Sequence, residues 1–388
     1  MAADAVKTTP LSHDTEQVLR ELDGARRGTL ALVGHLSEED LERVHSPIMS
    51  PLVWDLGHIA AYEDLWLCHR HGGRALLRPE LAGLYDAFET PRAIRGEIEA
   101  LGPEDARGYL EQVRARTIET LADCGVGDGL VCEMVLRHEL QHGETMRQTM
   151  VIAGLLEPSL HPLPGREGWI DLPGGPAAVG AGLGGFSYDN ERPRHTIEVP
   201  GFRIARRPVT NGSWMRFSDG GGYRRREWWS DEGWAWKQRH DITHHPAIAT
   251  AHPEAAVCHV SWFEADAFAR AHDARLPTEF EWEKAASAGL EDLEGPRPAG
   301  AALGPVHSGV LADVGGVWEW TGSHFRGYPG FIAHPYREYS EVFFGDRYRV
   351  LRGSSWATDP RVASVTFRNW DLPERRQIFS GVRLARGA

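Results

Sequence analysis

Two patterns of apolar and polar residues divide the chain near residue 156. In the first part, apolar residues recur at spacings of three and four, which is the pattern of amphipathic helices. We expect four helices there, over residues 15–34, 51–71, 103–124 and 129–155. Pro51 and Pro103 suit the first turn of a helix, and Ser50 suits the N-cap position before Pro51. Four such helices predict a bundle with a site between facing helices.

The second part of the chain has a different character. Residues 157–171 are rich in proline and interrupt every period, so we place the linker between two domains there. Most of the 14 tryptophans lie beyond the linker. Regular apolar patterns are few there: strand-like runs at 196–199 and 348–351, and helix-like runs at 262–272 and 279–286. We therefore expect a helical bundle over residues 1–156 and an irregular α+β domain over residues 157–388.

Composition narrows the classes of function. The 388 residues suit two domains, and no apolar run approaches the roughly 20 residues that span a bilayer. The net charge of -13 argues against a nucleic-acid or anionic-membrane partner. The N-terminal residues lack the basic and apolar regions of a secretory signal, and the four cysteines form no CxxC pair. We expect a cytoplasmic protein with reduced thiols that acts on small molecules.

The strongest chemical signal is the segment RHELQHGETM, residues 137–146. His138 and His142 are four residues apart, so both imidazoles leave one face of a helix. His58 is the best third ligand, because it stands within an apolar helix, where a buried histidine needs a partner. Three neutral nitrogens without a thiolate suit Zn²⁺ or Fe²⁺, and spacing does not choose between them. Glu144 is either a carboxylate on the helix surface or a group that orients a ligand histidine.

Six segments of the second domain carry a family resemblance. They are DNERPRH (189–195), FRIARRPVTNGSWMRF (202–217), VSWFEADAFARAHDARLPTEFEWEKAA (260–286), GGVWEWTGS (315–323), YRVLRGSSW (348–356) and FRNWDLPERRQIFSGVRLAR (367–386). In combination they resemble the fold of formylglycine-generating enzymes and their C-type-lectin-like relatives. Formylglycine-generating enzymes use a late pair of cysteines, whereas no cysteine follows Cys258 here, so that activity is not expected.

The first domain resembles a different family. SPLVWDLGHI (50–59) and HELQHGETM (138–146) are similar to segments of DinB-like four-helix metal proteins. A DinB-like bundle followed by a domain like that of the formylglycine-generating enzymes is the architecture of the ergothioneine-biosynthesis sulfoxide synthases, and this resemblance runs the length of the chain. Those enzymes use non-haem iron and dioxygen to join a sulfur donor to carbon 2 of the imidazole of hercynine, the Nα-trimethyl betaine of histidine. The resemblance implies that His58, His138 and His142 bind Fe²⁺.

The resemblance also implies a tyrosine from the second domain as proton donor. The segment GFIAHPYREYSEVFF offers Tyr336 and Tyr339. Tyr336 matches the family tyrosine by its distance upstream of the FF pair and of YRVLRGSSW, and Tyr339 is the alternative. A third interpretation makes both of them packing aromatics. Because the metal ligands belong to the first domain, we expect catalysis to need residues of both domains.

Further residues match family contacts to the two substrates. Asn369 and Trp370 match contacts to hercynine, whose trimethylammonium group favours an aromatic face, and Gln141 is a further candidate.

The segment LYDAFETPRAIR resembles the family's donor-binding segment, with Arg92 and Arg95 as contacts to carboxylates. Where the donor is γ-glutamylcysteine, Asp371 would bind its ammonium group. Two more arginines are either part of this charged cluster or solvated: Arg375 and Arg376.

Three other interpretations stay open. A selenoneine synthase would join a selenosugar to hercynine. The stretch 287–314 is short for an actinobacterial sulfoxide synthase, which favours this alternative. Two arginines and an aspartate, however, suit a peptide donor better than a neutral sugar. A DinB-like zinc thiol transferase would need neither dioxygen nor the tyrosine. A non-enzymatic binding module would keep its ligand without the histidines.

Overall fold

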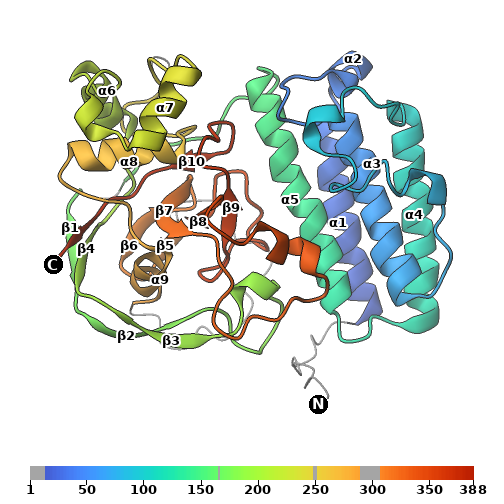
Figure 1. Cartoon of the computed structure of the whole chain (residues 1–388). Coiled ribbons are helices and arrows are strands. Elements are labelled where there is room, and N and C mark those ends of the chain that lie inside the picture. The colour runs from blue at the N-terminus through green and yellow to red at the C-terminus, as the bar shows by residue number, and fades with distance from the viewer. Residues whose placement is uncertain (1–13, 165–166, 248–250, 289–305) are drawn as a thin grey trace. The chain divides into compact units, whose positions relative to one another are not determined.

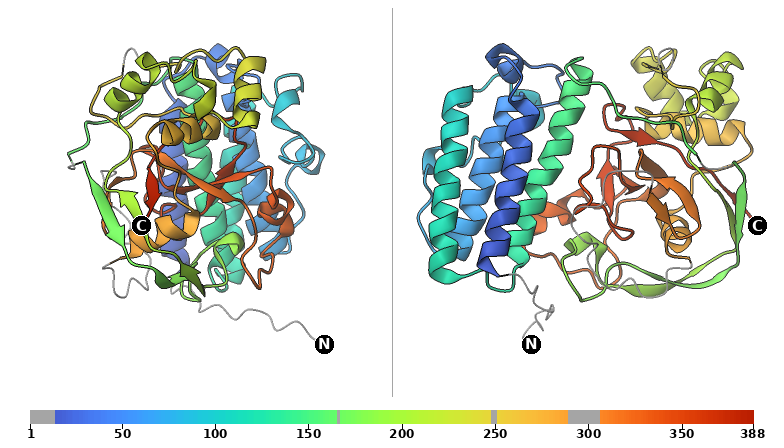
Figure 2. Two further views of the ribbon diagram at one scale, coloured as in Figure 1. Left: turned by 60° about the vertical axis from the view of Figure 1, so that its left-hand side comes forward. Right: turned by 180° about the vertical axis from the view of Figure 1, so that it is seen from behind.

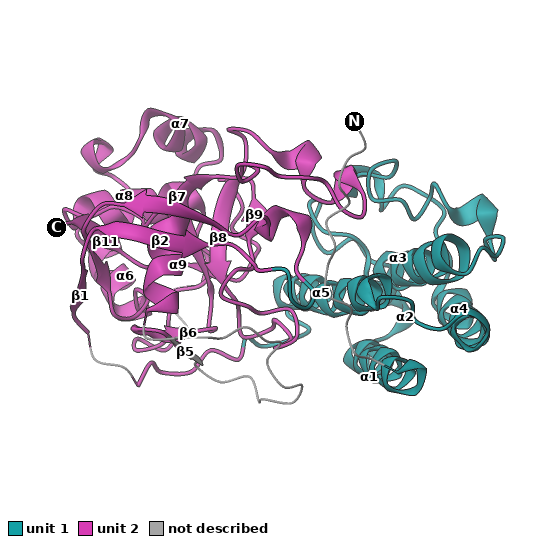
Figure 3. Ribbon diagram, turned by 90° about the horizontal axis from the view of Figure 1, so that it is seen from below, with its two compact units in different colours: residues 1–158, 183–186 teal, residues 159–182, 187–388 magenta. Residues whose placement is uncertain are grey.

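The computed structural model describes residues 14–164, 167–247, 251–288 and 306–388. The chain divides into two compact units (Figure 3). The first comprises Met1–Pro158 with Leu183–Phe186, and the second comprises Ser159–Gly182 with Ser187–Ala388. No helix within the described ranges is long and apolar enough to cross a membrane.

Four long helices lie side by side in the first unit (Figures 1 and 2). They are α1 (Thr15–Val33), α3 (Leu52–Glu63), α4 (Pro103–Cys124) and α5 (Leu130–Ile152). A π-helical segment, η1 (Asp64–His71), continues α3, so all four expected helices are confirmed. The sequence patterns did not indicate three short elements: α2 (Glu38–Glu42), η2 (Pro79–Leu81) and η3 (Arg92–Ile94).

The start of α3 differs from the prediction. Pro51 has an extended ψ of 141° and is itself the N-cap, so the helix begins one residue later, at Leu52. Ser50 does not cap the helix; its hydroxyl oxygen accepts a hydrogen bond from Nη1 of Arg95 at 2.8 Å. Pro103 does stand in the first turn of α4, where the missing N–H of proline leaves no helical hydrogen bond unmade.

Apolar side chains of the bundle pack into two buried clusters. Helix α3 packs against both α4 and α5, and α1 packs against α5. One cluster includes Leu56, Ile59, Val113 and Met146, and the other includes Val18, Leu22, Leu121 and Val135. Each such side chain contributes about 1.5–3 kcal/mol when it leaves water, so these faces stabilise the bundle.

The bundle also contains a buried group of four charges, which we call the ion cluster. Each of the four long helices supplies one member: Arg26, Glu63, Arg114 and Glu139. Arg26 contacts Glu63 at 2.8 Å and Glu139 at 2.9 Å, and Arg114 contacts Glu63 at 2.8 Å. Two positive and two negative groups cancel, as buried charges must.

Four small sheets form the framework of the second unit. The largest has the order β10–β7–β8–β9. In it β7 (Trp318–His324), β8 (Arg349–Gly353) and β9 (Asn369–Asp371) pair antiparallel, while β10 (Ser380–Gly381) runs parallel to β7. A three-stranded sheet joins β1 (Trp169–Leu172), β4 (Phe202–Ala205) and β11 (Ala385–Gly387). Two sheets have two strands each: β2 (Gly175–Val179) pairs with β3 (His195–Val199), and β5 (Val306–Ser308) pairs with β6 (Leu311–Val314). The strands expected at 196–199 and 348–351 are confirmed.

Helices α8 (Trp262–Ala271) and α9 (Glu279–Ser287) confirm the two helices expected in this unit. Two more helices were missed: α6 (Asn211–Asp219) and α7 (Asp231–Arg239). Each has only nine residues, too few for a clear apolar period. Their N-caps were the available signal, because the Thr210 and Ser230 side chains accept from the backbone N–H three residues on.

Most of the stretch 287–314 that the sequence marked as short, residues 289–305, lies outside the described residues. The end of the stretch forms β5 and β6.

Buried arginine–glutamate pairs hold the second unit together. Arg368 contacts Glu279 of α9 at 2.7 Å, and Arg383 contacts Glu319 of β7 at 2.7 Å. A third pair joins Arg352 of β8 to Glu283 of α9. Arg368 immediately precedes β9, so its pairing with α9 helps to place that strand.

Candidate metal centre

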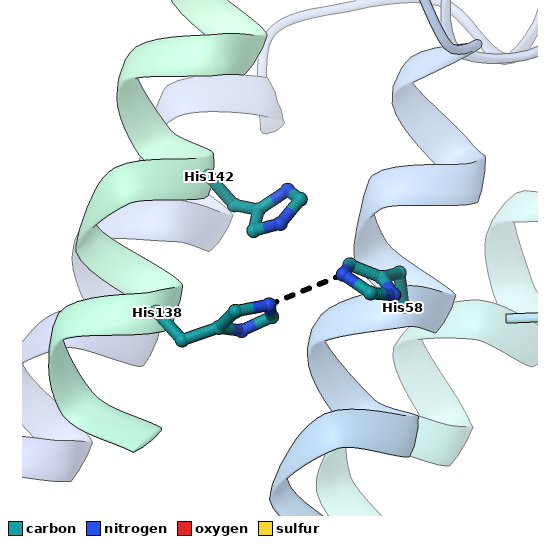
Figure 4. Close-up of side chains that lie close together, drawn as sticks. All are labelled: His58, His138 and His142. Carbon is teal, nitrogen blue, oxygen red and sulfur yellow. Dashed lines mark hydrogen bonds between the residues drawn. The ribbon is translucent and has the colours of Figure 1, made fainter. Parts of the chain in front are cut away.

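Three histidines come together between α3 and α5 (Figure 4). His58 belongs to α3, and His138 and His142 stand about one turn apart on α5. Their ligand atoms all lie within 4.8 Å of one another, and the Nε2 atoms of His58 and His138 are 3.1 Å apart. The structure therefore assembles the histidine trio that the sequence singled out, with the rings turned toward one another (Figure 4).

Hydrogen bonds at the outer nitrogens orient two of the three rings. Nδ1 of His58 lies 2.6 Å from the backbone carbonyl oxygen of Tyr85, and Nδ1 of His142 lies 2.9 Å from Oδ1 of Asp55. A carbonyl or carboxylate oxygen only accepts, so each Nδ1 carries a proton, and in a neutral ring Nε2 then keeps its lone pair. This is the tautomer that offers Nε2 to a metal ion.

Aromatic packing holds the rings as well. The indole of Trp54 stacks on His58 with ring centroids 4.8 Å apart, and the phenol of Tyr62 stacks on His138 with centroids 3.6 Å apart. Both aromatic residues stand four positions from His58 on its own helix, the spacing that brings helical side chains onto one face.

Gly57 lets Tyr85 approach α3. A Cβ atom at Gly57 would lie 2.1 Å from Cζ of the Tyr85 ring, closer than real Cβ contacts come. Any other residue would displace Tyr85, and with it the carbonyl that orients His58. Sequence reasoning did not assign Gly57 or Asp55; the signal for Asp55 was an acid about one helical turn before a candidate ligand.

Burial fixes the charge of two of the three histidines. Burial lowers the pKa of His58 and of His138 well below the ordinary range, and the neighbouring His142 lowers each of them further. Both imidazoles are therefore neutral at pH 7, the form that binds a metal ion.

The residues present fit a divalent transition metal. Two nitrogens bound to one ion at about 2.0–2.1 Å are roughly 3 Å apart, which matches the 3.1 Å between the Nε2 atoms of His58 and His138. Oδ2 of Asp55 is buried and has no hydrogen-bond partner in the described part of the chain, while Oδ1 of the same carboxylate contacts Nδ1 of His142. Imidazole nitrogens suit both zinc and iron.

Glu144 is buried on α5, with an exposed fraction of 7%. The interpretation that placed it on the helix surface is therefore wrong. The carboxylate that hydrogen-bonds a histidine of the trio is that of Asp55.

The two arginines of the predicted donor-binding segment have different surroundings. Arg95 is 6% exposed, and its guanidinium donates to the carbonyl of Thr90 and the hydroxyl of Ser50, both at 2.8 Å. The same guanidinium lies 3.6 Å from the ring centroid of Trp54, which stacks on His58. Burial lowers the pKa of Arg95 to about 10, so it remains a cation at pH 7. Arg92 begins η3 and is partly exposed.

Gln141 immediately precedes His142 on α5 and is partly exposed. Its role as a hercynine contact stays a prediction.

In the second unit, strand β9 contains the other three predicted contacts: Asn369, Trp370 and Asp371. The Trp370 ring stacks on Phe325 with centroids 4.2 Å apart. The Asp371 carboxylate lies 3.3 Å from Nε of Arg375. Of the two arginines left undecided, Arg375 thus pairs with Asp371, and Arg376 pairs with Glu264 at 3.0 Å.

The two candidate tyrosines lie in one loop of the second unit. Tyr336 is the N-cap of η7 (Arg337–Tyr339), and both tyrosines are partly exposed. Tyr339 stacks on Tyr188 with centroids 4.4 Å apart and contacts Trp370 edge-on at 5.8 Å. Tyr336 contacts the Tyr339 ring at 6.2 Å between centroids, and the choice of Tyr336 over Tyr339 as proton donor stays a prediction.

Family comparisons agree with this two-part organisation. Residues 21–146 match the DinB superfamily. Residues 161–306 and 297–388 match the Sulfatase-modifying factor enzyme 1-like domain. The expected fold class, a DinB-like helical bundle followed by a domain like that of the formylglycine-generating enzymes, is confirmed.

Several characterised proteins resemble the chain over nearly its whole length. Hercynine oxygenase of Mycolicibacterium smegmatis is 43% identical over 425 residues, covering 95% of this chain and 98% of its own. Hercynine oxygenase of Mycobacterium tuberculosis is 42% identical over 423 residues, with the same coverage of 95% and 98%. Ergothioneine biosynthesis protein 1 of Schizosaccharomyces pombe is 22% identical over 435 residues, covering 95% of this chain and 56% of its own.

Proposed function

The chain belongs to the hercynine oxygenase family, and we propose that it is an iron(II)-dependent enzyme that uses dioxygen to form a carbon–sulfur bond at carbon 2 of the hercynine imidazole. The proposed donor is γ-glutamylcysteine. The proposed product is the sulfoxide in which its sulfur is bonded to hercynine, an intermediate of ergothioneine biosynthesis. The observation that carries the proposal is the histidine trio, whose inner nitrogens converge between two helices.

His58, His138 and His142 would hold the iron through Nε2. A ferrous ion bound there would supply the redox chemistry that neither a thiol nor an imidazole has on its own. Three protein ligands leave coordination positions for substrates, whereas a closed structural site has none. The hydrogen bonds from Nδ1 to Tyr85 and Asp55 fix the rings before any ion arrives.

The overall reaction is balanced with dioxygen as the only oxidant. The C–H bond of hercynine and the S–H bond of the donor break, and a C–S bond forms. One oxygen atom ends on sulfur, and the other leaves as water with two protons. A proton donor is therefore required, and we assign this role to the phenol of Tyr336, because a phenol is protonated at neutral pH.

Both substrates carry charges that the assigned residues suit. The trimethylammonium group of hercynine favours an aromatic face such as that of Trp370, and its carboxylate favours the amide donors of Asn369 and Gln141. The carboxylates of γ-glutamylcysteine suit Arg92 and Arg95.

A selenosugar donor is the second candidate, favoured by one observation. Arg95 already donates to Ser50 and Thr90, and Asp371 already pairs with Arg375, so these charges have partners without a peptide. In that case the enzyme would form a carbon–selenium bond to hercynine.

The test is anaerobic assembly of the full chain with Fe²⁺ and hercynine, followed by each candidate donor and air. We expect mass spectrometry to find the γ-glutamylcysteine–hercynine sulfoxide. A selenosugar adduct in its place would select the second candidate. Equal turnover with Zn²⁺ and without dioxygen would contradict the oxygenase assignment and favour a thiol transferase.

The Tyr336→Phe variant tests the proton donor. Phenylalanine keeps the ring but removes the proton, so C–S bond formation should fall by roughly 10²-fold or more. Oxygen should still be consumed, now in oxidation of the donor. Unchanged rate and products, together with an impaired Tyr339→Phe variant, would move the assignment to Tyr339.

A further inference from the structure

One aspartate of the second unit connects both ends of the loop that contains the candidate tyrosines. We call residues 334–340 the tyrosine loop. Asp189 belongs to the short helix η4 (Asp189–Glu191) and is 4% exposed. Its Oδ1 accepts from the hydroxyl of Ser340 at 2.5 Å, and its Oδ2 accepts from the backbone N–H of His334 at 3.4 Å. The two donors are the first and last residues of the tyrosine loop, so Tyr336 lies between its two anchors.

The neighbour of Asp189 supports the same loop. The ring of Tyr188 stacks on Tyr339 with an interplanar angle of 8°. Tyr339 in turn contacts Trp370 of β9 and the ring of Tyr336, at 5.8 and 6.2 Å between centroids. The tyrosine loop is therefore held at its ends by a carboxylate and in its middle by ring packing.

Helix η4 is itself tied to the chain just before β9. The backbone carbonyl of Asn190 accepts from Nη1 of the buried Arg368 at 2.6 Å. The carboxylate of Glu191 accepts from the hydroxyl of Thr366 at 2.6 Å. Thr366 and Arg368 lie just before Asn369, the first residue of β9. One short helix thus joins the segment that carries the proposed proton donor to the segment that carries the proposed hercynine contacts.

The surroundings of Asp189 are unusual for a buried acid. Within the described ranges no arginine, lysine or histidine side chain forms an ion pair with it, and the charge of the nearby Glu191 raises its pKa. Burial raises the pKa of Asp189 to about 6, although the hydrogen bonds from Ser340 and from the His334 amide favour the charged form. A buried carboxylate without a cation is unfavourable, and here both of its oxygens accept from donors of the tyrosine loop.

We propose that Asp189 is a positioning residue of the reaction, which holds the tyrosine loop so that the Tyr336 phenol keeps a fixed place relative to Asn369 and Trp370. The inference deepens the proposed function and rests on it. Asp189 does not touch substrate in this role; it acts through Tyr336. Displacement of a proton donor by about 1 Å can reduce turnover by about 10²-fold.

The Asp189→Asn variant weakens an anchor with almost no change in volume. An amide has one acceptor oxygen, so either its NH₂ group faces the His334 N–H, donor against donor, or the Ser340 hydroxyl has to accept from that NH₂ group instead of donating to a carboxylate. Ser340→Ala removes the hydroxyl that donates to Oδ1 of Asp189, the shorter of the two hydrogen bonds. Asp313→Asn is the matched control, because Asp313 is an equally buried acid of the same unit, 2% exposed, in strand β6.

The first measurement is hydrogen exchange of the full chain, which does not depend on turnover. In Asp189→Asn and Ser340→Ala, we expect the amides of the tyrosine loop to exchange about tenfold faster, while α9 is unaffected. Asp313→Asn should leave the exchange of the tyrosine loop unchanged. Unchanged exchange in both anchor variants would overturn the proposal.

The second measurement is a double-mutant cycle with Tyr336→Phe. In the wild-type background, Asp189→Asn should lower kcat for C–S bond formation about 10- to 100-fold and reduce product formed per dioxygen consumed. Iron content and the KM for hercynine should stay within about twofold. In the Tyr336→Phe background, Asp189→Asn should cause no further loss, because both changes remove the same proton transfer.

The two measurements separate this inference from the proposed function. Additive losses in the cycle would overturn a role through Tyr336. If the wild-type chain forms no product from hercynine with either donor, the proposed function fails, and hydrogen exchange alone decides whether Asp189 anchors the tyrosine loop. Faster exchange would support the anchor, and unchanged exchange would overturn it.

Discussion

Helices α3 and α5 each contribute to two buried polar groups, and the two groups differ in how they are satisfied. In the ion cluster, Glu63 and Glu139 meet Arg26 and Arg114, so the charges cancel, although Nη1 of Arg114 has no hydrogen-bond partner in the described part of the chain. In the histidine trio, the outer nitrogens of His58 and His142 have acceptors, and the inner nitrogens of all three rings converge, with the Nε2 atoms of His58 and His138 3.1 Å apart. The first group balances its charges within the protein, whereas the second gathers three groups that can bind a cation.

This difference separates structure from function within one bundle. A satisfied polar network rigidifies and specifies the packing of the helices that supply it. Three imidazoles that converge on one place are instead typical of metal sites, where neutral rings serve as ligands. We therefore expect changes in the histidine trio to affect metal binding more than folding, and changes in the ion cluster to do the reverse.

The largest effect should come from removal of a ligand. His138→Ala should reduce iron affinity by more than the 10–100-fold typical of outer contacts, so that the purified protein holds almost no iron and has no activity. Metal analysis after anaerobic loading measures this. His69→Ala, an exposed histidine of η1, is the control and should load normally. Full loading of His138→Ala would remove this residue from the site.

Breaking the ion cluster should mainly cost stability. Glu63→Gln leaves two buried arginines facing one carboxylate, and removal of one partner from a buried pair costs about 3–5 kcal/mol. Urea unfolding of the apo protein measures the free energy of unfolding. If Glu63→Gln were as stable as the wild type, the ion cluster would not contribute to the stability of the bundle.

Acid should weaken the same cluster with a defined sign. Burial alone would raise the pKa of Glu63, but the charges of Arg114 and Arg26 outweigh it and lower the pKa from 4.5 to about 2. A lowered folded-state pKa gives stability that is present above pH 4.5 and lost as pH falls toward 2, about 3 kcal/mol in all. The stability difference between wild type and Glu63→Gln should therefore shrink over that range. A constant difference would contradict the assignment.

A smaller effect should follow from the group that orients His142. Asp55→Asn keeps an acceptor oxygen for Nδ1 but removes the charge, and loss of such outer contacts reduces metal affinity about 10–100-fold. Competition with a chelator measures the affinity without turnover. Asp64→Asn is the control: Asp64 is equally buried on η1 but accepts from the Leu77 amide, away from the trio. Equal losses in both variants would indicate general destabilisation instead.

The smallest effect belongs to a charge pair on the surface of α1. Arg27 and Asp23 form an exposed pair one helical turn apart. Arg27→Ala should change the free energy of unfolding by about 0.5 kcal/mol or less, because water screens such pairs. A loss as large as that of Glu63→Gln would mean that burial is not what distinguishes the ion cluster.

Much of the bundle was predictable from sequence because its signals are local. The 3.6-residue period gave the four helices, and the spacing of His138 and His142 placed both rings on one helix face. The missed helices α6 and α7 were too short for a period, and the start of α3 depended on the backbone angle of Pro51. Residue identity fixes local conformation most reliably where many residues repeat the same signal.

The family and the candidate chemistry also followed from sequence alone, because motifs such as HELQHGETM and FRNWD join residue type to position. Only the tertiary structure decided which groups surround them. It supplied Asp55 and the Tyr85 carbonyl to the trio, buried Glu144 and Arg95, and connected Asp189 to a loop about 150 residues away. Such contacts join distant segments, and no periodicity encodes them. Burial and hydrogen-bond partners, which set charge and orientation, exist only after the chain has packed.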